Sequence, residues 1–146
     1  MDRKCFLLLP LCPVYGLGAC AILSLPAKII QSPILLFLFG GATATVVEYL
    51  TALLYEKWFH VSFWDYGDLP GNLQGRVCIP FSLIWGVLSI PLVYRIHPML
   101  SPIFSAAPSP VGWAASVALL SDGIISALLL KRTGSRACLH WYAPPR

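Results

Sequence analysis

Residues 48–76 read EYLTALLYEKWFHVSFWDYGDLPGNLQGR and join the end of one apolar run to the start of the next. Four of the six acidic residues of the chain lie in this stretch, together with a cluster of aromatic side chains and three glycines. Because the remainder of the chain is mostly hydrocarbon, we expect its polar chemistry to be concentrated here.

The composition is that of a membrane protein. The chain has 146 residues, of which 58% are hydrophobic and 11% are charged. A soluble domain of this size carries roughly 25% charged and 45–50% apolar residues. The formal net charge of +4 does not indicate nucleic-acid binding, since the basic residues flank the apolar runs, where they set the orientation of membrane helices.

The length of the apolar runs predicts an all-α, polytopic bundle of about four transmembrane helices, since each span needs about 20 residues. The predicted spans are approximately 5–25, 34–55, 77–95 and 111–130. They would form a membrane domain over residues 1–130, with a basic tail at 131–146. Residues 98–110 contain four prolines, and we expect a loop there.

The charges outside the spans predict the orientation. With both termini in the cytoplasm, only Lys28 and Arg95 face the outside. Eight cations then lie inside: Arg3, Lys4, Lys57, Arg76, Lys131, Arg132, Arg136 and Arg146. This distribution follows the positive-inside rule. It predicts that residues 57–76 form a cytoplasmic loop.

Small residues mark one face of the second span for helix packing. Gly40, Ala44 and Glu48 are four residues apart on one face, and Gly41 lies beside them. Small side chains at this spacing let helix backbones approach closely in membranes. Gly86 predicts a second close contact in the third span. We therefore expect Glu48 to face other helices and not lipid.

Two acidic residues fall inside predicted spans, Glu48 and Asp122. A carboxylate at the bilayer centre costs at least about 2.5–3.5 kcal/mol and normally faces a bundle interior with a partner. Arg76 is the candidate partner, and we expect it to pair with Glu48 or Glu56. Such a pair could fix helix registry, contact a substrate or ion, or take part in proton transfer.

The loop supplies further substrate or ion-pair candidates, namely Asp65, Tyr66 and Asn72. No catalytic constellation is evident in the sequence. Glu48 and Glu56 would lie about 12 Å apart along a helix axis, which is too far for concerted acid–base work on one bond. The sequence predicts no bound cofactor, and its histidines and cysteines show no metal-ligand spacing. The phosphate-binding motif GxxxxGK[ST] is absent from the sequence, so any ATP-driven process would need a separate ATPase subunit.

Several motifs together resemble those of a known family. In order, they are CPVYGLGA at 12–19, EYLT at 48–51, EK at 56–57, WDY at 64–66, NLQGRVC at 72–78, WG at 85–86 and DxxxS at 122–126. This set resembles the bacterial ABC-transporter permease family, the CmpB-like "type IV" group. The resemblance implies a polytopic protein of the bacterial inner membrane with a role in transport. Family members carry one more helix before the CPxYG segment, so a short member or a different start is expected here.

Three functions are compatible with these observations. The first is a permease-like transport subunit in the lipid bilayer that forms a homo-oligomer or joins a partner membrane subunit and a separate ATPase. The second is a membrane-embedded enzyme or lipid-binding protein that uses the loop residues on a lipid headgroup. The third is a small scaffold for another membrane protein. The family resemblance favours transport over catalysis.

Overall fold

A computed structural model describes residue 8, residues 11–134 and residue 139 of the chain. Within these residues the regular secondary structure is helical, apart from an isolated bridge between Leu73 and Val77. The all-α prediction is therefore confirmed.

Three helical stretches are long and apolar enough to cross a membrane. They are α3 (Pro33–Phe59, 27 residues), the continuous run Ile79–Ala106 (28 residues) and α6 (Ser109–Thr133, 25 residues). The described part of the first predicted span contains α1 (Pro13–Leu23), an 11-residue helix. Its earlier part at 1–7 and 9–10 lies outside the described residues, as do 135–138 and 140–146 of the predicted basic tail. The number of spans and their orientation stay predictions.

The start and end of α3 follow from local sequence signals. Ser32 is the N-cap residue, and its hydroxyl accepts a hydrogen bond from the Leu35 N–H at 3.5 Å. Pro33 occupies the first turn, where a missing N–H costs nothing. At the other end His60 adopts a left-handed conformation (φ 56°), which stops the helix and directs the chain into the loop.

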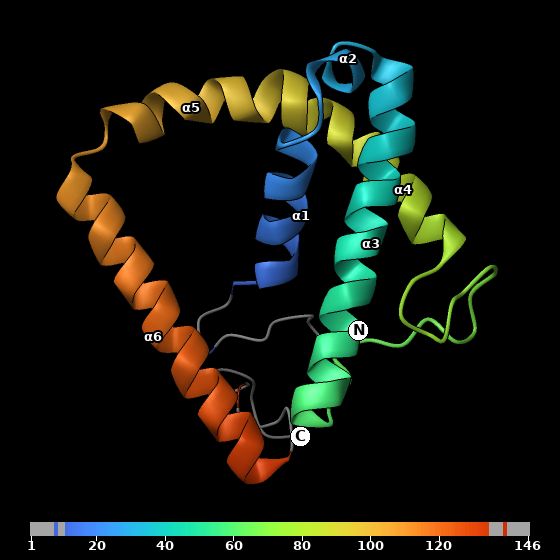
Figure 1. Cartoon of the computed structure of the whole chain (residues 1–146), viewed down its shortest axis with the longest axis vertical. Helices are drawn as coiled ribbons and strands as arrows, with labels where there is room; N and C mark the ends of the chain where they lie inside the picture. The colour runs from blue at the N-terminus through green and yellow to red at the C-terminus, as the bar shows by residue number, and fades with distance from the viewer. Residues whose placement is uncertain (1–7, 9–10, 135–138, 140–146) are drawn as a thin grey trace, which may run out of the picture.

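Residues 98–106 and 109–110 are helical and only Ala107 and Pro108 connect the two helices, so the prediction of a loop over 98–110 is wrong. α4 (Ile79–Pro91) continues through a π-helical turn, η1 (Leu92–Ile96), into α5 (His97–Ala106). The chain bends there, and α5 runs across one end of the molecule (Figure 1). Membrane helices tolerate prolines because local changes of helical register compensate for the lost hydrogen bonds. The π-helical turn after Pro91 is such a change.

α3 and α4 cross at glycines. A Cβ atom on Gly41 would lie 2.9 Å from the Ser82 carbonyl oxygen and 3.1 Å from the Gly86 Cα atom. One on Gly86 would lie 2.7 Å from the Phe37 carbonyl oxygen. The Thr45 hydroxyl also donates a 2.8 Å hydrogen bond to the Ser82 hydroxyl. The two helices are thus held at backbone contact distance, and this crossing places the α4 side chains beside Glu48.

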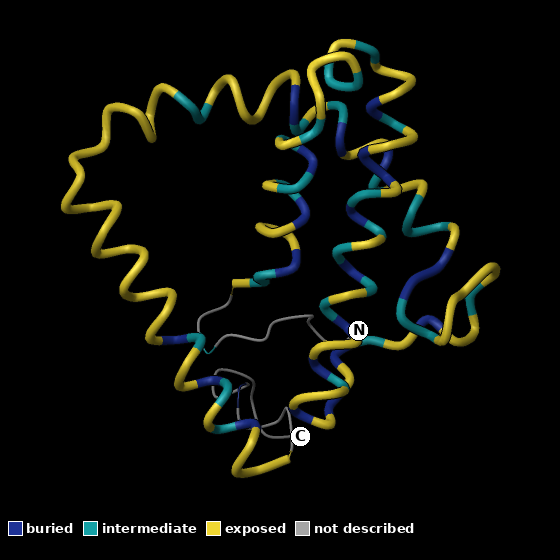
Figure 2. The backbone as a smooth tube through the Cα atoms, in the orientation of Figure 1, coloured by how far each residue is buried: buried dark blue, intermediate teal, exposed yellow. Residues whose placement is uncertain are grey.

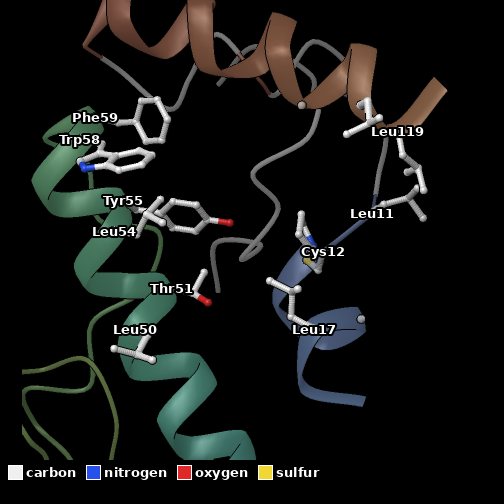
Figure 3. Close-up of a pocket in the computed structure, with 14 residues that line it drawn as sticks. Leu11, Cys12, Leu17, Leu50, Thr51, Leu54, Tyr55, Trp58, Phe59 and Leu119 are labelled. Atoms are coloured by element: carbon white, nitrogen blue, oxygen red, sulfur yellow. The ribbon is translucent and has the colours of Figure 1, made fainter. Parts of the chain in front are cut away.

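α6 stands away from the other helices over its first half. Residues 102–121, in the second half of α5 and the first half of α6, are continuously exposed (Figure 2), whereas the buried residues of α6 lie in its second half. α1, α3 and α6 form the walls of a cavity of about 960 Å³ (Figure 3). α2 (Ala27–Ile30) is a single turn that connects α1 to α3.

Candidate functional site

Glu48 lies at the centre of the bundle with 1% of its surface exposed. Its Oε1 accepts a 3.0 Å hydrogen bond from the Tyr66 hydroxyl, and its Oε2 accepts a 3.1 Å bond from the Trp85 indole Nε1–H. Tyr66 comes from the loop and Trp85 from α4. A buried carboxylate is stable only when hydrogen-bonding partners compensate for its lost hydration, and these two donors provide part of that compensation.

Aromatic packing fixes both donors in place. The Tyr66 ring stacks on Phe81 with ring centroids 4.7 Å apart and an interplanar angle of 23°. The Trp85 ring lies 5.5 Å from the ring of Tyr15 on α1. Residues of α1, α3, α4 and the loop therefore meet around the single carboxylate of Glu48.

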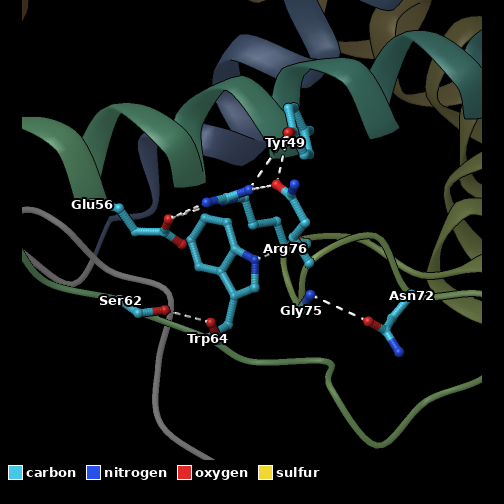
Figure 4. Close-up of polar contacts among 8 residues, drawn as sticks. Tyr49, Glu56, Ser62, Trp64, Asn72, Gly75 and Arg76 are labelled. Carbon is cyan, nitrogen blue, oxygen red and sulfur yellow. Dashed lines mark hydrogen bonds and ion pairs between the residues drawn. The ribbon is translucent and has the colours of Figure 1, made fainter.

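Arg76 forms a second polar cluster, at the loop surface of α3 (Figure 4). Its Nη2 and Nε lie 2.6 and 2.9 Å from Oε2 of Glu56. The guanidinium also contacts the Gln74 amide oxygen and lies 5.4 Å from the centre of the Tyr49 ring. The hydrogen bond to Glu56 raises the pKa of Arg76 above its ordinary value, because it stabilises the cationic form.

Hydrogen bonds to its own backbone hold the loop in a defined shape. The Asn72 side-chain amide donates to the carbonyl oxygens of Gly67 (2.8 Å) and Leu69 (3.0 Å) and accepts from the Gly75 N–H (3.3 Å). The Asp65 carboxylate accepts from the Gly67 N–H at 2.9 Å. Gly75 has a φ of +71°, and a Cβ atom there would collide with the Asp65 carboxylate. The side chains of Asn72 and Asp65 thus stabilise the folded conformation of the loop.

The closed loop is tied to both polar clusters. The Tyr66 N–H donates to the Gly75 carbonyl oxygen at 2.7 Å, and the Trp64 indole N–H donates to the Arg76 carbonyl oxygen at 2.8 Å. Tyr66 then reaches Glu48, and Arg76 reaches Glu56, which is two turns further along α3. The loop therefore contacts α3 at two depths as one hydrogen-bonded unit.

Asp122 lies apart from these clusters, on the second half of α6. Asp122 Oδ1 and the Ser126 hydroxyl oxygen each accept a 3.1 Å hydrogen bond from the backbone N–H of Leu8. The Ser126 hydroxyl is 3.4 Å from Asp122 Oδ1. The two acids predicted inside spans are both buried, and they belong to separate polar groups.

The structure thus assigns the predicted polar residues to three groups. Glu48 binds Tyr66, Glu56 binds Arg76, and Asp122 binds the backbone N–H of Leu8. Of the two partners considered for Arg76, the structure places Glu56 beside it. The residues that sequence reasoning missed are Tyr49, Gln74 and the indole of Trp85 as a hydrogen-bond donor. Because a buried indole N–H usually finds an acceptor, Trp85 on a membrane helix was a signal for such a bond.

The model of a protein family described as "Putative ABC-transporter type IV" matches residues 1–129 of the chain. No curated protein and no solved structure matches it. The matched range contains the Glu48 site, the Arg76 cluster, the loop that joins them and the Asp122 pair.

Proposed function

Because the chain belongs to the family described as "Putative ABC-transporter type IV", we propose that it is the permease-like membrane subunit of a transporter and lacks its own ATPase domain. It would be a multi-pass protein of the bacterial inner membrane. The loop between α3 and α4 would be the element through which a separate ATPase acts on the helices.

The hydrogen bond between Tyr66 and Glu48 is the observation that carries this proposal. It links an exposed, hydrogen-bonded loop directly to a buried carboxyl group at the contact of three helices. Loss of one partner of a buried hydrogen bond costs about 1–3 kcal/mol. A shift of the loop by a bond length would therefore change the balance of interactions around Glu48 deep in the bundle.

The shape of the loop supports a role in transmitting movement. Asn72 and Asp65 close it through backbone hydrogen bonds, and the Arg76–Glu56 ion pair holds its end against α3. A unit closed in this way moves as a whole and does not deform locally. The positive-inside rule would place it in the cytoplasm, where ATP is available.

The described helices support the proposal that another membrane subunit is present. Three long helices are too few to surround a solute path, and α6 contacts α3 only near their ends (Figure 1). We propose that a homo-oligomer or a partner membrane subunit completes the path. Because Glu48 is buried within one chain beneath Tyr66, it would serve as a substrate or ion contact only after the loop moves away from it.

A lipid-headgroup enzyme is less well supported by the geometry. That function would use Asp65 and Asn72 as ligand-binding groups, but their side chains bind the backbone of the loop. A scaffold function predicts that Glu48 affects assembly alone. Measurement of solute accumulation alongside membrane lipid composition separates the three functions.

Cross-linking of the full chain in cells of its source bacterium tests the proposal. A tagged chain should capture a subunit that carries the GxxxxGK[ST] motif, and Tyr66→Phe should reduce the ATP-dependent accumulation of a solute without reducing that capture. Tyr94→Phe is the matched control, since Tyr94 binds the Ile30 carbonyl away from the loop. Capture of no ATPase, together with unchanged solute levels and altered lipid composition in Tyr66→Phe, would overturn the proposal.

A further inference from the structure

Two pairs of aromatic rings meet at the Glu48 carboxyl group. Tyr66 donates a hydrogen bond to Oε1 and stacks on Phe81. Trp85 donates to Oε2 and lies against the Tyr15 ring of α1. A carboxylate neutralises a positive charge that is removed from water, and the face of an aromatic ring attracts a cation, most strongly when the ring is tryptophan. Aromatic rings gathered around a buried acid therefore have the chemistry of a site for an organic cation.

The Tyr66 side chain fills the position that such a cation would take. Its ring lies on Phe81 with centroids 4.7 Å apart, and its hydroxyl directs a polarised hydrogen at Glu48 Oε1 over 3.0 Å. A ligand with a flat apolar body and a positively charged end would make the same two contacts. Its charged end would interact with the carboxylate more strongly than the neutral hydroxyl does, because contacts between two ionised groups are the strong ones.

The loop segment that carries Tyr66 lies between two buried anchors. Val61 is buried before it and Val77 is buried after it. Residues 67–74, between these anchors, are exposed or half-buried. Segments with few buried contacts are the ones that open at low free-energy cost. Movement of this segment about its anchors would withdraw the Tyr66 ring and open Glu48 toward the loop side of the molecule.

We propose that Glu48, Phe81 and Trp85 bind an organic cation in the place of the Tyr66 side chain. The ligand class is an ammonium or quaternary ammonium group attached to an aromatic or other flat apolar body. The apolar body lies on the Phe81 ring, and the ammonium group lies at the Glu48 carboxylate beside the Trp85 indole. This inference rests on the proposed transport function, since it names the class of solute that the subunit carries.

The groups at Glu48 favour an organic cation over a metal ion. Hard metal cations take six or more oxygen ligands, and the part of the chain that the structure describes contains no group of three histidine, cysteine or acidic residues that could hold a metal. The Trp85 indole N–H lies 3.1 Å from Oε2 and is a donor only, so it cannot bind a metal ion. The ring faces, in contrast, contribute directly to the binding of an organic cation.

Isothermal titration calorimetry of the purified full chain in detergent tests the site. The probe is phenyltrimethylammonium, whose ring matches that of Tyr66 and whose charged group takes the place of the hydroxyl. The control ligand is 2-phenyl-2-propanol, which has the same ring and a neutral branched group of similar size. Wild type should bind the cation at least about tenfold more tightly than the alcohol, and Glu48→Gln should remove this preference.

Changes to the rings test where the cation binds. Tyr66→Ala removes the side chain that fills the site, so the loop no longer has to open, and phenyltrimethylammonium should bind about tenfold more tightly. Phe81→Leu keeps an apolar side chain but removes the ring face, and binding should weaken about fivefold. Asp68→Asn removes an exposed acid elsewhere on the loop and should leave binding unchanged.

Two results would overturn the inference. One is equal affinity of wild type for the two ligands, which would mean that the charge is not recognised. The other is equal weakening of cation binding by Glu48→Gln and Asp68→Asn, which would mean a general attraction of cations to acidic residues. Circular dichroism at 222 nm checks that each variant is folded, and Phe81→Leu keeps the test decisive if Tyr66→Ala does not fold.

The binding experiment and the transport experiment fail separately. Calorimetry uses the purified chain and needs neither an ATPase nor a solute gradient. Cation binding as predicted, together with unchanged solute accumulation in Tyr66→Phe, would contradict the transport function alone. Loss of the preference for the cation, together with reduced accumulation in Tyr66→Phe, would contradict the cation site alone.

Discussion

The Tyr66 hydroxyl donates a 3.0 Å hydrogen bond to the Glu48 carboxylate, which joins the loop between α3 and α4 to the buried centre of the helix bundle. The two residues are 18 positions apart, and the chain between them leaves the helix and folds back. The position of the loop and the hydrogen bonding of the buried Glu48 carboxyl group are therefore coupled. A substitution at Tyr66 should therefore alter the surroundings of Glu48, and a substitution at Glu48 should alter the position of the loop.

Tyr66→Phe should destabilise the protein by about 1–3 kcal/mol, because it removes a hydrogen bond to the buried Glu48 carboxyl group and keeps the ring that stacks on Phe81. Thermal unfolding in detergent, followed by tryptophan fluorescence, measures the effect. Tyr94→Phe should cost less, since the Tyr94 hydroxyl binds a neutral carbonyl and is more exposed. Equal destabilisation by the two changes would mean that the Tyr66–Glu48 hydrogen bond contributes no more to stability than the Tyr94–Ile30 hydrogen bond.

Gly86→Ala should destabilise the crossing of α3 and α4. The new methyl group would lie 2.7 Å from the Phe37 carbonyl oxygen, so one helix would have to move. Overpacking of this kind typically costs about 1–3 kcal/mol. Gly112→Ala is the matched control, since it adds the same methyl group in open space and should be neutral or slightly stabilising. Similar unfolding temperatures for both variants would show that the helices separate at little cost.

The packing face of α3 was predictable, because small residues four apart indicate close helix contact whatever the partner. The partner of Arg76 was not, since the choice between Glu48 and Glu56 depends on how far the loop folds back. That distance is set by Asn72 and by the positive φ angles of Gly71 and Gly75. Sequence patterns identify such turn residues but do not give the path that they produce.

Prolines misled the prediction for residues 98–110. Four prolines in a short segment predict a loop in water, where the backbone groups freed by each ring can bind solvent. The structure continues as helix through Pro98 and Pro102 to Ala106, with Pro98 in the first turn of α5. In a bilayer no water satisfies an open backbone, so helix is favoured despite the lost hydrogen bonds.

Arg76→Lys should make the closed loop sensitive to alkaline pH. The hydrogen bond to Glu56 raises the pKa of Arg76, so the contribution of the wild-type pair is fully present below the unfolded-state pKa of arginine and is lost only as pH rises through the still higher folded-state pKa. A lysine loses its charge near pH 10.4. Loop cleavage by a protease active at pH 8–10 should therefore accelerate with pH in the variant relative to wild type.

The control for this experiment is Lys57→Gln, which removes a nearby cation that no described hydrogen bond ties to the loop. Its cleavage rate should parallel that of wild type at each pH. If Arg76→Lys also parallels wild type up to pH 10, the ion pair does not hold the loop closed.

Glu48→Gln and Glu48→Leu should differ in stability, because glutamine can still form hydrogen bonds with Tyr66 and Trp85 and leucine cannot. The glutamine amide keeps one oxygen to accept from the Trp85 indole N–H, and its NH₂ group can donate to the Tyr66 hydroxyl, which accepts as readily as it donates. The leucine satisfies neither group, and each polar group left unsatisfied in a buried site costs about 1–3 kcal/mol. We expect Glu48→Gln to unfold close to wild type and Glu48→Leu to be several kcal/mol less stable. If a charge at this position serves transport, Glu48→Gln should lose solute accumulation while keeping its unfolding temperature. Equal destabilisation by both changes would instead mean that the negative charge itself holds the bundle together, and Glu48 would then be a structural residue.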